Sequence, residues 1–241
     1  MKKKIVLLLN LLIVAFTLFG LGVMLYLNGK DSGLLSSAGW ENLKYFTVQS
    51  NILCGIVALI YLVRHLVILP RQHSEKKERM QEIQSANDGP TAKWLRNVPC
   101  PQWLMTLKLA AAAAVTVTFL VVACFFGPLY GYRYMYLGSN LWFHLIIPVL
   151  GMVEFCLLDG QLPFKRTFFA GSPALIYGCF YLGNILINGK GEWPNTNDWY
   201  GFMNWGMGIA LVIFAVIIIV NWGVACLLRA MSRRVSENTS P

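Results

Sequence analysis

Apolar residues fall into six long blocks, and this pattern restricts the fold more than any other feature of the sequence. Each block is close to the roughly 20 residues that a helix needs to cross about 30 Å of hydrocarbon. Inside lipid, every backbone N–H and C=O must bond within its own segment, so the blocks are expected to be helices. The alternation of a transmembrane barrel, over strands of about 10 residues, is missing. The sequence therefore predicts an all-α polytopic membrane protein, a six-transmembrane-helix bundle.

The predicted spans cover residues 5–27, 43–69, 104–127, 140–158, 169–188 and 202–228. One substantial polar loop, at about 70–103, separates the second span from the third. The other connections are short, so consecutive helices are expected to be antiparallel neighbours in one bundle. We therefore treat residues 1–241 as a single membrane domain.

Basic residues set the expected orientation. The chain has 20 Lys and Arg against 11 Asp and Glu, a net charge of +9. With the N-terminus inside, sixteen of the 20 basic residues fall on the cytoplasmic side, and those outside are Lys30, Lys44, Arg133 and Lys190. Membrane proteins carry this excess of basic residues in their cytoplasmic loops. The sequence thus predicts cytoplasmic N- and C-termini, in a protein of the plasma or cell membrane.

Composition argues against several other classes of protein. The basic residues lie beside span ends and the charged run Glu75-Lys76-Lys77-Glu78-Arg79 lacks interleaved aromatic residues, so a nucleic-acid partner is not expected. The 6 cysteines show no CxxC or Cys/His spacing that would suggest a metal site. Nucleotide-binding and haem motifs are missing too, and we expect no obligatory cofactor. The expected partner is a membrane lipid.

Polar residues inside spans are candidates for function because lipid penalises them. Thr47 and His144 each lie about four residues into their spans, which corresponds to a depth of about 6 Å. In the predicted orientation both depths are in the outer leaflet, where polar residues of other spans reach a similar level. We expect a pocket there, with substrate-binding residues Ser50, Asn51, Asn140, Asn184, Asn188 and Asn204.

A threonine and a histidine at one depth have a chemical interpretation. Neutral imidazole can take the proton of a hydroxyl, which then attacks an ester or amide carbonyl. Pro148 lacks an N–H and should leave the carbonyl of His144 without its usual helical donor. Alternatively, Thr47 bonds back to the carbonyl of Leu43 and His144 joins helices through Asn140 or a tyrosine. The residues alone leave both interpretations open.

Two charged residues lie deeper in the predicted spans. Glu154 is well inside the fourth span, and Lys108 is a few residues into the third span from the cytoplasmic side. Antiparallel neighbours would place them at a similar depth, so a structural ion pair is expected. A proton relay is the alternative.

Three short motifs resemble the androgen-induced and androgen-dependent TFPI-regulating protein family. The motifs are Lys44-Tyr45-Phe46-Thr47, Phe143-His144-Leu145-Ile146-Ile147-Pro148, and the outer segment from Glu192-Trp193-Pro194 to Asp198-Trp199-Tyr200. The resemblance implies six spans and an intramembrane threonine hydrolase that cleaves fatty acid esters of hydroxy fatty acids. It also implies that Thr47 is the nucleophile and His144 the base. A non-enzymatic transporter or lipid-binding protein, using the same polar pocket, is the alternative function.

Overall fold

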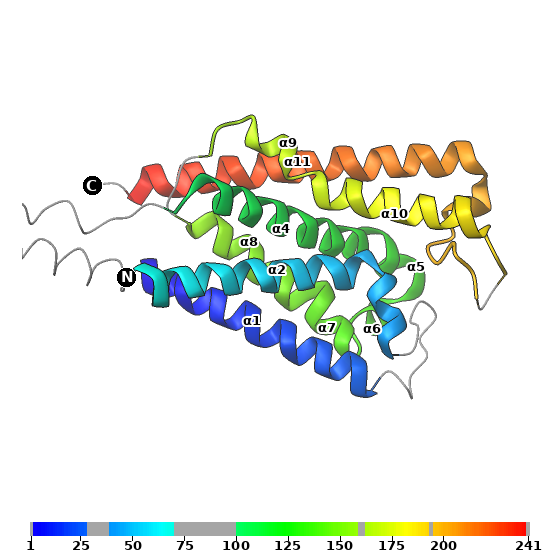
Figure 1. Cartoon of the computed structure of the whole chain (residues 1–241), viewed down its shortest axis with the longest axis horizontal. Coiled ribbons are helices and arrows are strands. Elements are labelled where there is room, and N and C mark those ends of the chain that lie inside the picture. The colour runs from blue at the N-terminus through cyan, green and yellow to red at the C-terminus, as the bar shows by residue number, and fades with distance from the viewer. Residues whose placement is uncertain (1, 28–38, 70–99, 159–161, 193–194, 240–241) are drawn as a thin grey trace, which may run out of the picture.

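The computed structural model describes residues 2–27, 39–69, 100–158, 162–192 and 195–239. Within these residues the fold is all-α, and six helices are long and apolar enough to cross a membrane, which confirms the predicted fold class. The first helix begins and the last helix ends at the same end of the bundle, which we call the termini end; the opposite end is the far end (Figure 1). Most of the predicted loop at 70–103 lies outside the described residues.

The six spans are built from the following elements. The first two are α1 (Lys2–Leu27) and α2 (Phe46–Val63), which is preceded by η1 (Gly39–Lys44) and continues as the π-helical turn η2 (Arg64–Ile68). The third comprises α4 (Gln102–Val121), the π-helical turn η3 (Val122–Phe126) and α5 (Gly127–Tyr130). After α6 (Tyr132–Met135), the fourth comprises α7 (Ser139–Leu141), the π-helical turn η4 (Trp142–Ile146) and α8 (Ile147–Leu157). The last two are α9 (Arg166–Phe169) with α10 (Ser172–Asn188), and, after η5 (Phe202–Trp205), α11 (Met207–Thr239).

The last helix differs most from the range expected for it, 202–228. Residues Phe202–Trp205 form the separate turn η5, and Gly206, with φ +85°, breaks the backbone before α11 begins at Met207. At its other end α11 continues to Thr239. Hydropathy marks where lipid ends, whereas the Arg, Ala, Met and Glu residues that follow still favour a helix in water.

Helix α4 lies at the centre of the bundle, against α2, α8 and α11, while α1 covers α2 and α8. Its run Ala110–Ala114 is at most 4% exposed. Small side chains allow membrane helices to approach closely, since no hydrophobic effect drives them together in lipid. Helix α10 packs at the edge of the bundle, against α11, α4 and α2. Its residues Ala174, Tyr177, Gly178 and Tyr181 line a cavity.

A buried ion pair joins the helices nearer the termini end. Lys108 Nζ of α4 lies 3.0 Å from Glu154 Oε1 of α8, and both side chains are at most 4% exposed. Asn10 of α1 accepts a hydrogen bond from Lys108 and donates one of 2.7 Å to the same Glu154 oxygen. The Lys108 ammonium also lies 4.9 Å from the ring centre of Tyr61. The expected ion pair is confirmed, and its hydrogen bonds offset the cost of burying two charges.

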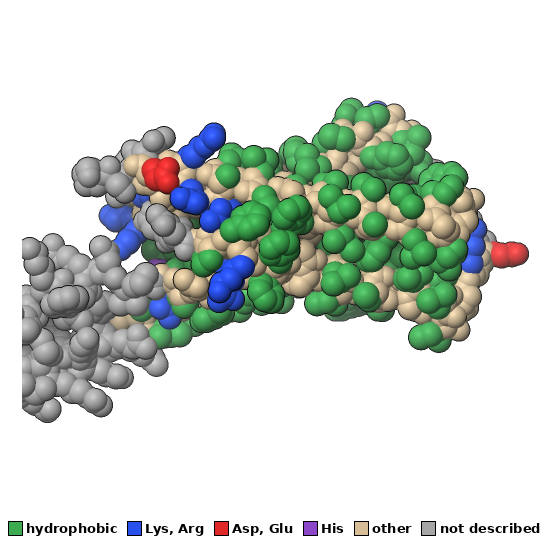
Figure 2. All heavy atoms as spheres, turned by 90° about the horizontal axis from the view of Figure 1, so that it is seen from above, with side chains coloured by type: hydrophobic (Ala, Val, Ile, Leu, Met, Phe, Trp, Pro, Cys, Tyr) green, Lys and Arg blue, Asp and Glu red, His purple; other side chains and the backbone are tan. Residues whose placement is uncertain are grey.

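The surface has the pattern of a lipid-facing bundle. Hydrophobic side chains cover the visible length of the molecule, and Lys and Arg gather near the termini end, with a few charges at the far end (Figure 2). Helix α11 illustrates this, because only 22% of its most apolar stretch is buried by the rest of the protein. The six candidate spans indicate an integral membrane protein.

Candidate functional site

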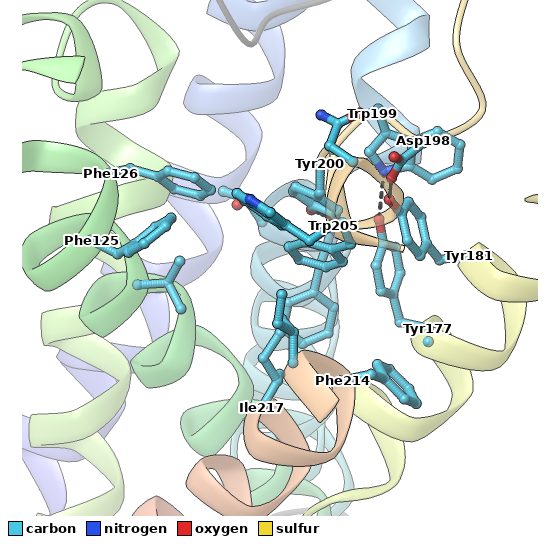
Figure 3. Close-up of a pocket in the computed structure, with 18 of the residues that line it drawn as sticks. Phe125, Phe126, Tyr177, Tyr181, Asp198, Trp199, Tyr200, Trp205, Phe214 and Ile217 are labelled. Atoms are coloured by element: carbon cyan, nitrogen blue, oxygen red, sulfur yellow. Dashed lines mark hydrogen bonds between the residues drawn. The ribbon is translucent and has the colours of Figure 1, made fainter. Parts of the chain in front are cut away.

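A cavity of about 1510 Å³ occupies the far-end half of the bundle (Figure 3). One wall is formed by the end of α4 with η3 and α5, and the opposite wall by α10 and the first turns of α11. Phe46 and Thr47 of α2 also line the cavity, together with residues from 190–192 and 196–205. In Figure 3, Phe125 and Phe126 face Trp205 and Tyr200 across the space. The walls are mainly apolar and aromatic with few polar groups, as is usual for small-molecule sites.

Thr47 lines this cavity at the start of α2. Thr47 is half-buried and its hydroxyl forms no hydrogen bond with the described residues, so the bond to Leu43 of the alternative interpretation is not made. The Leu43 carbonyl instead accepts from Gln49 Nε2 at 2.9 Å. Thr47 is also the second residue of α2, where the backbone N–H has no acceptor within the helix. Among the described residues, neither the hydroxyl nor the N–H of Thr47 has a hydrogen-bond partner, so both are available at one wall position.

The turn that carries Thr47 is held by its neighbours. Its carbonyl oxygen accepts hydrogen bonds from Ser50 Oγ at 3.0 Å and from Asn51 Nδ2 at 2.7 Å. Ser50 Oγ also lies 3.2 Å from Thr118 Oγ1 of α4. Ser50 and Asn51 are both fully buried, so in this structure they position α2 and lie outside the cavity wall.

His144 lies in the π-helical turn η4 and is half-buried. Its Nδ1 is 2.6 Å from the carbonyl oxygen of Met135. A carbonyl can only accept, so Nδ1 carries the proton of the neutral ring and Nε2 keeps a lone pair. This is the tautomer that a general base acting through Nε2 requires. His144 is not one of the residues that line the cavity.

Asn51 connects the Thr47 turn to the His144 turn. Its Nδ2 donates to the carbonyl oxygen of Thr47 and, at 2.9 Å, to that of Phe143. Phe143 needs this donor because η4 shifts the backbone register: Ile147 N bonds to Trp142, five residues earlier. The next residue in that register is a proline, which has no N–H to give. The orphan carbonyl is therefore that of Phe143 in this register, where a regular α-helix would have orphaned that of His144.

The turn η3 shows the same arrangement, a π-helical turn before a proline with a side chain that donates to the orphan carbonyl. Gly127 N bonds to the carbonyl of Val122, and the following residue is Pro128, so the carbonyl of Ala123 lacks a backbone donor. Tyr132 Oη supplies the hydrogen bond at 2.8 Å. Single π-helical turns inside α-helices are frequent at functional sites. Of these two, η3 lines the cavity and η4 carries His144.

The remaining predicted asparagines gather mostly around the segment 189–206. Asn184 Nδ2 donates to Asn197 at 3.1 Å, Asn188 donates to Asn184 at 2.9 Å, and Asn204 accepts from Lys190 Nζ at 2.8 Å. Asn204 lines the cavity, whereas Asn184 and Asn188 do not. Asn140 is half-buried at the start of α7, one turn before His144, and is also outside the cavity wall.

Sequence reasoning missed a polar aromatic wall. Tyr177 Oη donates to the Lys44 carbonyl at 2.7 Å and accepts from Trp199 Nε1 at 3.0 Å. Tyr181 donates to Asp198, which is 3% exposed and also accepts from Met203 N at 2.9 Å. The polar tyrosines of the fifth span and the dense run of aromatic residues before the last span were the signals. They did not reveal that the segment folds back onto α10.

Tyr200 links this wall to the turn of Thr47. Its Oη accepts a hydrogen bond of 2.9 Å from Phe46 N, the first residue of α2. Burial, the neighbouring Tyr177 hydroxyl and its hydrogen bond raise the pKa of Tyr200 well above the usual value, so the phenol stays neutral. The wall thus holds the first turn of α2, which carries Thr47. Among the described residues, no group of three or more His, Cys, Asp or Glu could hold a metal ion.

The fold and the cavity define a class of protein, a six-helix integral membrane protein with a large apolar cavity at one end. No protein-family model matches the chain, and neither a curated protein nor a solved structure matches it.

Proposed function

We propose that the protein is an intramembrane hydrolase of lipid esters, such as fatty acid esters of hydroxy fatty acids, with Thr47 as nucleophile and His144 as base. The observation that supports this most is the Thr47 hydroxyl, which lines the apolar cavity and has no hydrogen-bond partner among the described residues. A structural threonine inside a membrane helix normally bonds to a carbonyl one turn earlier. Two of the three motifs that resemble the androgen-induced and androgen-dependent TFPI-regulating protein family contain these residues, one Thr47 and the other His144.

The reaction needs few groups. Thr47 Oγ attacks the ester carbonyl while its proton passes to His144 Nε2, directly or through one water. The alcohol leaves with that proton, and the acyl group remains as an ester on Thr47. Water then attacks the acyl-threonine with the same base, which releases the fatty acid and restores both side chains. The N–H of Thr47 at the start of α2 is suited to stabilise the oxyanion, because the positive end of the helix dipole lies there.

The cavity walls favour a lipid substrate. Residues such as Phe125, Leu129 and Ile209 belong to membrane-spanning helices and are more than half exposed. Transfer of an acyl chain from the bilayer to these side chains costs little, since neither environment is water. The polar lining residues Lys190, Glu192, Thr196, Asp198 and Asn204 would then lie at the level of the ester.

Covalent labelling tests the proposal. A fluorophosphonate probe applied to membranes should label the wild-type protein and fail to label Thr47→Ala or His144→Ala. Matched controls are Thr116→Ala, whose buried hydroxyl bonds to Ala112 on α4, and His65→Ala, whose Nδ1 contacts Tyr61 at the termini end. Equal labelling of wild type and Thr47→Ala would refute Thr47 as the nucleophile.

One observation favours the second candidate, a non-enzymatic lipid-binding or transport protein. His144 does not line the cavity, and a binding protein would need only the apolar walls. Such a protein would retain a bound lipid after both substitutions and would hydrolyse none. Measurement of lipid binding beside labelling therefore separates the two candidates.

A further inference from the structure

A second hollow lies near the termini end, on the lipid-facing side of the bundle. It has a volume of about 440 Å³ and lies between the α9–α10 junction and α11. We call it the α9–α11 groove, and its lining residues are Phe168, Phe169, Gly171, Ser172, Leu175, Ile218, Ile219 and Trp222. Phe168, Phe169 and Ile219 are at least 60% exposed, so the groove is open to the side. Its size is in the range of about 300–1,000 Å³ that holds small ligands.

Stacked rings give the groove a fixed floor. The rings of Phe168 and Trp222 are stacked with centroids 5.5 Å apart, and Trp222 Nε1 donates to Thr167 Oγ1 at 3.2 Å. Phe164 packs edge-on against both rings. These contacts hold α9 against α11, so the groove keeps its shape without an occupant.

Two guanidinium groups lie beside these rings at the termini end. The Arg166 guanidinium is 5.9 Å from the ring centre of Phe169, and the Arg229 guanidinium is 5.7 Å from that of Phe164. Arg229 is anchored through Nε to the Leu162 carbonyl at 2.7 Å. Arg166 Nε is buried and has no hydrogen-bond partner among the described residues. Neither arginine forms an ion pair with a described carboxylate, and the exposed Lys165 adds a third positive charge.

We propose that the α9–α11 groove binds the acyl chain of an anionic phospholipid, with the lipid phosphate against Arg166 and its basic neighbours. Arginine matches phosphate through paired N–H donors, and basic pockets between membrane helices bind anionic headgroups. The charge near the groove differs from that of the large cavity. The groove lies beside basic residues, whereas the cavity is lined by Glu192 and Asp198 together with a single lysine, Lys190. The inference does not depend on the hydrolase proposal. In the predicted orientation the groove faces the cytoplasmic leaflet, which is where anionic lipids are enriched.

Native mass spectrometry of the purified protein tests this site, with phosphatidylglycerol and phosphatidylcholine of identical acyl chains as probes. We expect one phosphatidylglycerol to be retained in preference to phosphatidylcholine. Arg166→Gln should weaken its retention by about tenfold or more, since hydrogen bonds to charged groups are the stronger ones. The matched control is Arg133→Gln, an exposed arginine of α6 at the far end, which should leave retention unchanged.

A variant that fills the groove distinguishes lipid binding in the groove from nonspecific attraction of anionic lipid to basic surface residues. Ser172→Phe keeps every charge and places a ring in the groove, so it should also displace phosphatidylglycerol, while the thermal midpoint of the lipid-free protein reports whether it folds. Arg166→Lys keeps the positive charge but loses the paired N–H donors of the guanidinium group, so it should retain lipid to an intermediate extent. Equal retention of both lipids, equal effects of Arg166→Gln and Arg133→Gln, or undiminished binding in a folded Ser172→Phe would each overturn the proposal. If the purified wild-type protein is a dimer and Ser172→Phe is a monomer that still retains lipid, the proposal is overturned and the groove is assigned to a partner helix.

Discussion

Asn51 Nδ2 lies 2.9 Å from the carbonyl oxygen of Phe143. This single contact ties the first turns of α2 to the π-helical turn that presents His144, because the same nitrogen holds the carbonyl of Thr47 at 2.7 Å. Two residues that are almost a hundred positions apart in the chain are thus oriented by one buried amide. The proline at position 148 creates the need for it, by leaving the Phe143 carbonyl without a backbone donor.

Replacement of Asn51 should therefore lower stability more than replacement of an asparagine outside the contact. Asn51→Ala removes both donated bonds and leaves a buried carbonyl unpaired, so we expect a loss of about 1–3 kcal/mol in the free energy of unfolding. Asn140→Ala, at a half-buried position of α7, is the control and should cost less. Unfolding in detergent, followed by circular dichroism, measures both. An Asn51→Ala protein as stable as the control would show that the carbonyls find other donors.

Pro128, which leaves the Ala123 carbonyl without a backbone donor, gives a second prediction of the same kind. Tyr132→Phe removes only the hydroxyl that donates to Ala123, and it should lower stability by about 1 kcal/mol. Tyr134 is the control, since it is 66% exposed, and Tyr134→Phe should have no measurable effect. A larger substitution tests the packing: a Cβ on Gly127 would lie 2.2 Å from the Tyr132 ring, so Gly127→Ala should displace that ring. The order of thermal midpoints should be Tyr134→Phe, Tyr132→Phe, Gly127→Ala, from highest to lowest.

Features of the fold and the site that depend on the positions of residues along the chain could be predicted from the sequence. Features that depend on how distant segments pack against each other could not. The six helices follow from the length of the apolar blocks, and the pairing of Lys108 with Glu154 follows from their depths in adjacent antiparallel spans. The role of Asn51 does not follow, because it depends on a register shift in another helix. Likewise Asn184 and Asn188 have the depth expected of pocket residues, yet Asn184 donates to Asn197, Asn188 donates to Asn184, and neither lines the cavity. The depth of a residue in the membrane follows from its position in the sequence. The direction in which its side chain points depends on how the helices pack.

The buried ion pair should be structural. Glu154→Gln leaves the Lys108 ammonium buried without its counter-charge, and breaking such a pair costs about 3–5 kcal/mol. The double variant Lys108→Met/Glu154→Leu removes both charges and should recover most of that loss. The specific activity of whatever Glu154→Gln protein remains folded should match that of the wild type. A well-folded but inactive Glu154→Gln protein would move the functional site toward the termini end.

Orientation can be checked with single cysteines in a background without native ones. Glu192→Cys, in the exposed segment at the far end, should react with an impermeant maleimide added to intact cells. Arg234→Cys, exposed on α11 at the termini end, should react only after the membrane is opened. These outcomes follow from sixteen of the 20 basic residues lying on the predicted cytoplasmic side. Labelling of Arg234→Cys in intact cells would reverse the orientation and place the large cavity in the inner leaflet.

The proposed mechanism makes its own kinetic prediction for Thr47 and His144. Thr47→Ala should lower ester turnover by about 1,000-fold or more, because no other group replaces the nucleophile, and His144→Ala should lower it by about 100-fold or more. Thr47→Ser keeps a hydroxyl at the same wall position and should retain part of the activity. The base must be neutral, so turnover should fall when acidification protonates His144, and this pH dependence should disappear in His144→Ala. Hydrolysis of a lipid ester by purified protein in micelles measures all three, with Thr116→Ala as the control. A Thr47→Ser protein as inactive as Thr47→Ala, or a pH profile unchanged in His144→Ala, would argue that the cavity binds lipid without cleaving it.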